Sequence, residues 1–110
     1  MPGQALNRHT RQVLERMTDG FYALDREFRF TYINAAAERI LGQAREDLLN
    51  KNLWELFPPL IETPLYAAYH EAQATGQTVI FEFYYPPFEH WIEVRVYPAP
   101  EGLSVSFRDI

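Results

Sequence analysis

The side chains of this chain best able to bind a metal ion or transfer a proton near neutral pH are three histidines. They are His9, His70 and His90, and no two of them have the His-Glu-x-x-His spacing of a helical zinc site. A metal site would therefore need ligands from distant parts of the chain. The chain has no cysteine, which excludes disulfides, thiolate zinc sites, iron–sulfur clusters and a cysteine nucleophile.

Two groups of carboxylates could take part in acid–base chemistry. Glu82, Glu93 and Arg95 lie at alternate positions of predicted strands, where we expect a solvent-exposed charge ladder on the outer face. The acidic pair Glu46 and Asp47 fits the start of a helix, where negative charge meets the positive end of the helix dipole. No nucleophile elbow or glycine-rich phosphate loop is present. The sequence therefore predicts no catalytic residue and no metal ligand.

Aromatic side chains are abundant, and several are predicted to converge between helices and a sheet. These converging residues are Trp54, Phe57, Tyr69, Phe81, Phe83, Val94 and Phe107. They are consistent with a filled hydrophobic core. They are also consistent with a small pocket in that core for an apolar or aromatic ligand, with Tyr69 or Tyr32 as its polar contact.

Length and composition describe one globular domain. The chain has 110 residues, 47% of them hydrophobic, and a net charge of −5 with acidic and basic residues interspersed. A nucleic-acid-binding surface would need a basic face, so no nucleic-acid partner is expected. No apolar run approaches the roughly 18 residues of a membrane span, and no signal peptide is visible. We expect a soluble cytoplasmic domain without membrane insertion.

Two strands and a short helix are predicted after residue 18. The strands carry apolar side chains at a period of two, separated by the polar segment 25–27: Phe21, Ala23, Phe30 and Tyr32. Asn34 is the predicted N-cap of the helix 35–41, because its side-chain oxygen can accept a free backbone N–H. Gly42 can adopt the left-handed conformation that ends this helix.

The elements on either side of this segment complete the chain. Residues 6–17 predict an amphipathic helix, whose apolar stripe covers its own sheet or packs against a second copy in a dimer. Short helical turns follow residue 42, and a longer helix begins at Thr63-Pro64 and ends at Gly76. Three strands then alternate apolar and polar side chains, with these apolar positions: Val79, Phe81, Phe83, Tyr85; Ile92, Val94, Val96; Leu103, Val105, Phe107.

This order of elements resembles a PAS domain, the small sensor module of bacterial signalling proteins. The resemblance covers residues 19–110, with two mild departures at Ala44 and Asn50. It rests on these segments: Asp19-Gly20-Phe21, Asp25, Phe30-Thr31-Tyr32-Ile33-Asn34, Ala36, Leu41-Gly42, Trp91-x-Glu93-Val94-Arg95-x-Tyr97-Pro98 and Gly102-Leu103-Ser104-Val105-x-Phe107-Arg108-Asp109-Ile110. The last two segments are similar to the final strands of PAS domains attached to sensor histidine kinases.

The resemblance implies an α+β fold. We expect a five-stranded antiparallel sheet with short helices and one longer helix on one face, plus the N-terminal amphipathic helix. Residues 1–18 would form a cap or signalling helix, and residues 19–110 the PAS domain. PAS relatives bind flavins, haem or small metabolites, but the cofactor stays unknown. A haem ligand would fall near Leu65, which cannot ligate iron, and the missing cysteine removes the thiol-linked chromophores.

The resemblance also implies a function. We expect a non-enzymatic sensing and dimerisation module of a larger signal-transduction protein, with an effector domain after Asp109-Ile110. Its homodimer would use the N-terminal helix and the outer sheet face, where Tyr84, Trp91 and Tyr97 lie. The alternatives are a ligand-free dimerisation module and a cone-shaped enzyme of the ketosteroid-isomerase type. The enzyme would need an acid or base inside its cavity.

Overall fold

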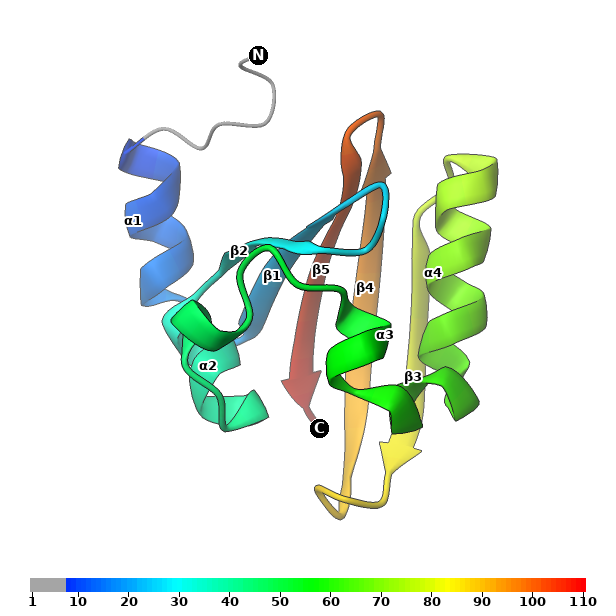
Figure 1. Cartoon of the computed structure of the whole chain (residues 1–110). Helices are drawn as coiled ribbons and strands as arrows, with labels where there is room; N and C mark the ends of the chain where they lie inside the picture. Colours follow the sequence, from blue (N-terminus) through cyan, green and yellow to red (C-terminus); the bar gives the residue numbers. More distant parts are fainter. Residues whose placement is uncertain (1–7) are drawn as a thin grey trace.

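A five-stranded antiparallel sheet forms the centre of the computed structural model, which describes residues 8–110 (Figure 1). Its strands are β1 (Gly20–Asp25), β2 (Phe30–Ile33), β3 (Val79–Tyr85), β4 (His90–Ala99) and β5 (Gly102–Asp109). They lie in the order β2-β1-β5-β4-β3, and each neighbouring pair is antiparallel. The predicted α+β fold is confirmed.

Helices occupy the connection between β2 and β3 and pack on one face of the sheet. They are α2 (Ala35–Leu41), the 3-10 helix η2 (Arg45–Asp47), α3 (Leu53–Leu56), the 3-10 helix η3 (Pro58–Glu62) and α4 (Pro64–Thr75). Figure 1 shows α3 and α4 in front of the sheet, and α1 (Arg8–Arg16) at the side near α2. A hydrophobic core therefore lies between this helical layer and the sheet.

The predicted helix boundaries follow from local hydrogen bonding. Asn34 is the N-cap of α2 and accepts the backbone N–H of Ala37 at 2.9 Å. Thr63 caps α4 in the same way, with Pro64 at the first helical position. Gly42 and Gly76 end the two helices with φ of 70° and 73°, a conformation that costs glycine little.

The last three strands have the predicted orientation. Val94, Val96 and Val105 are at most 2% exposed on the inner face, whereas Ile80 and Trp91 are more than half exposed on the outer face. The inner positions of β3 oppose those of β4, as in the pair of Phe83 and Ile92. The wall beneath the helices is therefore apolar, and the outer face mixes charged and aromatic side chains.

The predicted orientation of β1 was wrong, and that of β2 was half right. Tyr22 and Leu24, not Phe21 and Ala23, are the buried side chains of β1. In β2 the register shifts, because Leu24 pairs with Phe30 while Ala23 pairs with Tyr32. This bulge places one extra residue between the two pairs, so strict alternation fails there. Phe30 is buried as predicted, but Tyr32 lies opposite Ala23 on the other face.

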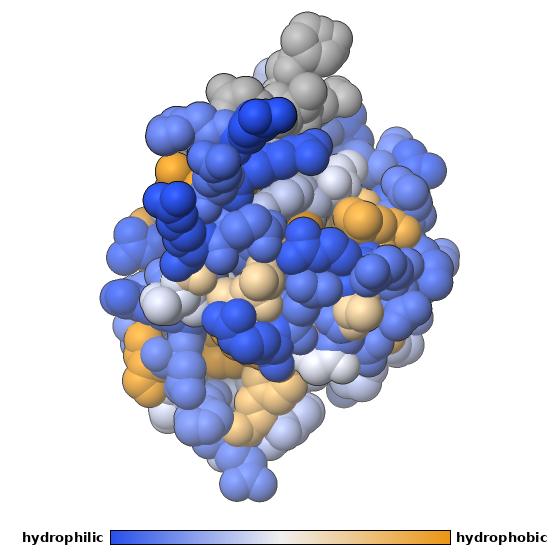
Figure 2. Space-filling model, turned by 90° about the vertical axis from the view of Figure 1, so that its left-hand side faces the viewer, coloured by the Kyte–Doolittle hydropathy of each residue, from blue (hydrophilic) through white to orange (hydrophobic). Residues whose placement is uncertain are grey.

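The N-terminal helix packs by its end and not along the sheet. The predicted helix spanned residues 6–17, and Leu6 of its apolar stripe lies outside the described residues. From Arg8 to Arg16 the helix has no buried residue, and Val13 is 47% exposed. Figure 2 views the side that carries α1 and α2, which is largely hydrophilic with small scattered hydrophobic groups. Over residues 8–110, no helix combines the length and hydrophobicity needed to cross a membrane.

Candidate ligand cavity

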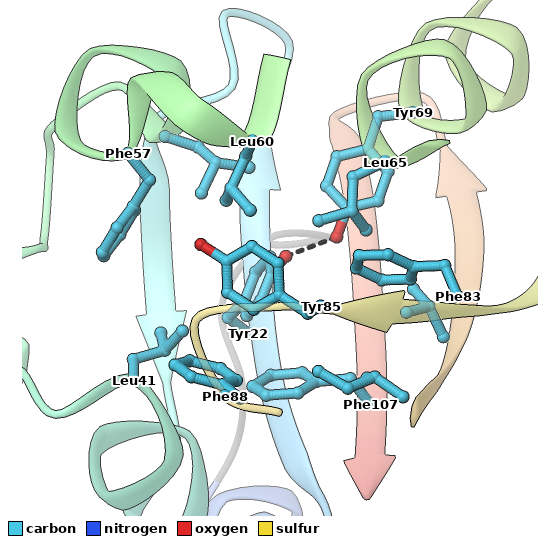
Figure 3. Close-up of a pocket in the computed structure, with 13 residues that line it drawn as sticks. Tyr22, Leu41, Phe57, Leu60, Leu65, Tyr69, Phe83, Tyr85, Phe88 and Phe107 are labelled. Atoms are coloured by element: carbon cyan, nitrogen blue, oxygen red, sulfur yellow. Dashed lines mark hydrogen bonds between the residues drawn. The ribbon is translucent and has the colours of Figure 1, made fainter. Parts of the chain in front are cut away.

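An apolar cavity of about 110 Å³ lies between the helical layer and the inner face of the sheet. Four strands, four helical segments and the turn between β3 and β4 contribute to its wall, as Figure 3 shows. The wall consists of Tyr22, Leu41, Leu53, Phe57, Leu60, Leu65, Tyr69, Phe83, Tyr85, Phe88, Ile92, Val94 and Phe107. Most of these side chains are buried, whereas Leu41, Phe57, Tyr85 and Phe88 are half-buried.

Five of the eight predicted site residues line this cavity: Phe57, Tyr69, Phe83, Val94 and Phe107. Trp54 is buried in the same core, but its ring packs against Tyr69 at 5.6 Å and is not part of the wall. Phe81 lies on the inner face next to Phe83, again outside the wall. Tyr32 lies on the outer face, so its predicted role as a polar contact of the ligand is not supported by its position.

The polar contact on the cavity wall that sequence reasoning missed is Tyr22. Its hydroxyl hydrogen-bonds that of Tyr69, and the two side chains are 5% and 0% exposed. Figure 3 shows the pair bridging β1 and α4 behind the ring of Tyr85. Burial raises the pKa of both hydroxyls far above the ordinary value for tyrosine. Both side chains therefore stay protonated and neutral at physiological pH.

Two other wall residues lie at positions that the period-two pattern marks as inward-facing. Tyr85 and Ile92 occupy the alternating inner positions of β3 and β4. Phe88 comes from the turn between them, and its ring packs edge-on against Tyr85 at 4.8 Å. A turn residue has no periodicity that would reveal its direction. Leu65, which stands where haem-binding relatives would have their iron ligand, also lies in the wall.

No charged side chain lines the cavity among the described residues. Glu82 is exposed, and Glu93 lies on the outer face, where its carboxylate is 2.9 Å from Arg108 and 3.5 Å from Arg95. Glu93 thus pairs with Arg95 on the outer face as predicted, but its side chain is only 16% exposed and its shorter contact is with Arg108. A cone-shaped isomerase would require one of these carboxylates in the cavity, and neither of them is there.

His70 of α4 belongs to a cluster of rings that includes Tyr66 and Phe28. Its ring centroid is 4.2 Å from that of Tyr66 and 4.7 Å from that of Phe28. The Nδ1 atom is 2.7 Å from the carbonyl oxygen of Tyr66, which can only accept, so Nδ1 carries the proton. Within residues 8–110, no group of three or more metal-binding side chains is placed to hold a metal ion.

A second polar centre joins α1 to α2. Glu15 accepts hydrogen bonds from the Tyr32 hydroxyl, from the Ala35 backbone N–H at 3.2 Å and from the Arg45 guanidinium at 3.1 and 3.3 Å. Arg45 also pairs with Glu38 at 2.9 Å. Burial raises the pKa of Glu15, but the hydrogen bonds from Arg45, Tyr32 and Ala35 and the charge of Arg45 outweigh it, so the net shift is downward.

Asn34 also connects α1 to α2 at this junction. It is fully buried, and its amide oxygen accepts from Phe21 and Ala37 while its amide nitrogen donates to the carbonyls of Leu14 and Asp19. One side chain therefore satisfies backbone groups of α1, β1 and α2. The sequence predicted Asn34 only as the N-cap of α2.

The fold agrees with comparisons to known proteins. The family model described as the PAS fold matches residues 14–110. The chain therefore belongs to the PAS fold family. No curated protein matches the chain.

Solved structures give the same fold. The PAS domain of histidine kinase ThkA is 21% identical with a TM-score of 0.71, covering 83% of this chain and 99% of that one. A PAS domain from Colwellia psychrerythraea is 16% identical with a TM-score of 0.75, covering 94% and 95%. A sensory box sensor histidine kinase from Vibrio cholerae is 15% identical with a TM-score of 0.75, covering 90% and 87%. The chain is thus similar in fold to PAS domains of sensor histidine kinases.

Proposed function

We propose that this chain is the sensing and dimerisation module of a larger cytoplasmic signal-transduction protein, of the sensor histidine kinase type. The observation that carries the proposal is the apolar cavity inside a fold of this family. We propose that the cavity binds a small apolar or aromatic ligand. The wall supplies aromatic and aliphatic surface around the buried hydroxyls of Tyr22 and Tyr69 and the half-buried side chain of Tyr85, the usual composition of a small-molecule site.

The cavity volume limits the size of that ligand. Drug-sized ligands occupy pockets of roughly 300–1,000 Å³, and an apolar cavity of roughly 150 Å³ holds benzene. At about 110 Å³ the cavity therefore suits one small ring and not a flavin or haem. A ligand that fills the cavity would bury further apolar surface of its wall, so its binding should stabilise the domain measurably.

Two elements connect the cavity to the ends of the chain. Leu41 of the cavity wall is the last residue of α2, and the first turn of α2 holds Glu15 of α1. Phe107 of the wall lies two residues before Asp109, where β5 ends. A ligand that favours one packing of α2 and β5 would therefore change both the N-terminal helix and the departing C-terminal end. It can do so only by its difference in affinity for the two arrangements.

We further propose a homodimer that uses α1 and the outer face of the sheet, with an effector domain after Ile110 in the full-length protein. The outer face exposes four large hydrophobic side chains: Ile80 at 56%, Tyr84 at 46%, Trp91 at 54% and Tyr97 at 41%. Tyr84 and Trp91 contact each other edge-on at 5.9 Å. Hydrophobic side chains gathered in this way favour a protein partner.

Native mass spectrometry of protein purified without denaturation tests the ligand and the dimer together. We expect a dimer mass, and an added mass of the size of a small ring compound or a rise in melting temperature with such compounds. A dimer mass without added ligand, together with an unchanged melting temperature across a panel of small ring compounds, would leave the ligand-free dimerisation module as the function.

A further inference from the structure

Two buried hydroxyls in the cavity wall form an incomplete hydrogen-bonding group. Tyr22 comes from β1 and Tyr69 from α4, and both side chains line the cavity. Each hydroxyl has the other as its hydrogen-bonding partner, and residues 8–110 supply no third partner to either. Figure 3 shows the two oxygens directed toward each other and joined by their hydrogen bond, among the residues of the wall.

A count of protons shows what this pair lacks. Two protonated hydroxyls carry two protons, and one proton makes the hydrogen bond between them. The second proton has no acceptor among the described residues, although both side chains are more than nine-tenths buried. A buried donor without an acceptor is costly. A ligand oxygen in the cavity would be that acceptor.

The rest of the wall excludes charged ligands. Every residue that lines the cavity is neutral, and the nearest ion pairs described above lie on the outer face or at the α1 junction. A carboxylate or ammonium placed there would lose its hydration without gaining an opposite charge. The small volume excludes more than one ring.

From these features we propose that the ligand is a neutral compound with a single ring and one acceptor oxygen, which accepts a hydrogen bond from the Tyr22–Tyr69 pair. The inference rests on the proposed ligand-binding function of the cavity. A phenol or a cyclic ketone has this chemistry. Leu65, Phe83 and Val94 would surround the ring, while the oxygen lies toward the two hydroxyls.

The test measures dissociation constants for four probes: benzene, phenol, cyclohexanone and benzoate at pH 7. NMR titration of the intact domain gives each constant. We expect phenol to bind the parent at least as tightly as benzene, although water solvates phenol better. In the double variant Y22F/Y69F, the preference for phenol over benzene should fall about fivefold, the usual effect of one neutral hydrogen bond. The preference for cyclohexanone over benzene should fall by a similar factor.

Tyr32→Phe is the matched control, because it removes a tyrosine hydroxyl on the outer face and should leave these preferences unchanged. An unchanged phenol preference in Y22F/Y69F, or benzoate that binds as well as phenol, would overturn the inference while the cavity kept its ligand-binding function. If Y22F/Y69F lost the preference for phenol but not that for cyclohexanone, the ligand would be the hydrogen-bond donor, which contradicts the proposal that it is the acceptor. If none of the four probes binds, both the inference and the proposed function fail.

The ligand series on the parent tests the inference even where the double variant does not fold. The single variants provide a second check, since each retains one hydroxyl with a free proton. Tyr22→Phe and Tyr69→Phe should therefore each keep most of the phenol preference. If either single variant loses as much of the preference for phenol over benzene as the double variant is expected to lose, the assignment of a shared hydroxyl pair is wrong.

Discussion

The contact between α1 and α2 depends mainly on one carboxylate, so Glu15→Ala should release α1 without unfolding the domain. Glu15 bonds to Tyr32, Ala35 and Arg45, and no side chain of α1 is fully buried, Leu14 being half-buried. The Asn34 amide also donates to the carbonyl of Leu14 in α1.

The size of the effect follows from the exposure of these groups. The side chains of Glu15 and Arg45 are 34% and 33% exposed, so solvent weakens their attraction. Arg45 also keeps Glu38 at 2.9 Å after the substitution and is not left unpaired. Three partially exposed hydrogen-bonding partners together are worth about 1–2 kcal/mol. The docked population of α1 should fall by a factor of roughly 5–30 relative to the released one.

Hydrogen exchange measured by mass spectrometry separates helix release from global unfolding. In Glu15→Ala, the amides of α1 should exchange faster, whereas those of β4 and β5 should keep their parental protection. Gln12→Ala, at an exposed position of the same helix, is the control and should leave α1 unchanged. Parental protection of α1 in Glu15→Ala would refute this account of the junction, as would an equal loss of protection in α1 and the sheet.

Four further outcomes are expected. The Glu15 pKa is below its reference value of 4.5 while α1 is docked, so the released helix binds a proton more readily, and acid should release α1. The protection factor of the α1 amides, which corrects for the pH dependence of intrinsic exchange, should therefore fall as the pH drops below about 4.5, and an unchanged protection factor between pH 6 and 3 would contradict this. Asn34→Ala removes four hydrogen bonds from a fully buried side chain and should cost about 2–4 kcal/mol in urea unfolding, with a loss below about 1 kcal/mol counting against it. Gly20→Ala would place a Cβ in the space filled by the ring of Phe107, so its melting temperature should fall by an amount equivalent to about 1–3 kcal/mol, and an unchanged value would be inconsistent with this packing. Trp91→Glu should weaken the proposed homodimer in sedimentation experiments without loss of fold, and a dimer of parental strength would exclude this part of the outer face.

Much of the fold could be predicted because the chain signals its boundaries by local chemistry. Asn34, Gly42, Thr63 and Gly76 act at the helix ends where their side-chain or backbone properties are needed. The period-two pattern of β3, β4 and β5 held because both neighbours of β4 are regular, so no bulge altered which face a residue occupies. These features depend on a few adjacent residues, and a sequence displays them directly.

The cavity was predicted only in part because its polar contact depends on strand register. All of Phe21, Tyr22, Ala23 and Leu24 are apolar or aromatic, so either phase of β1 offers a hydrophobic face. The extra residue of β2 between the pairs Leu24–Phe30 and Ala23–Tyr32 then places Tyr32 on the outer face, while the regular pairing of β1 with β5 keeps Tyr22 on the inner face. A bulge is a long-range pairing irregularity, and the sequence of β2 alone gives no sign of it. The meeting of Tyr22 and Tyr69 joins residues 47 positions apart and required the tertiary structure.

A methyl NMR titration of the intact domain with phenol tests the ligand-binding cavity most directly. We predict saturable shifts for the methyl groups of Leu53, Leu65, Ile92 and Val94, which line the cavity. The methyl groups of Ile80, which is 56% exposed on the outer face, should stay unchanged. Shifts confined to Ile80 and other exposed methyl groups, or no shifts at millimolar phenol, would contradict the assignment of this cavity as the sensing site.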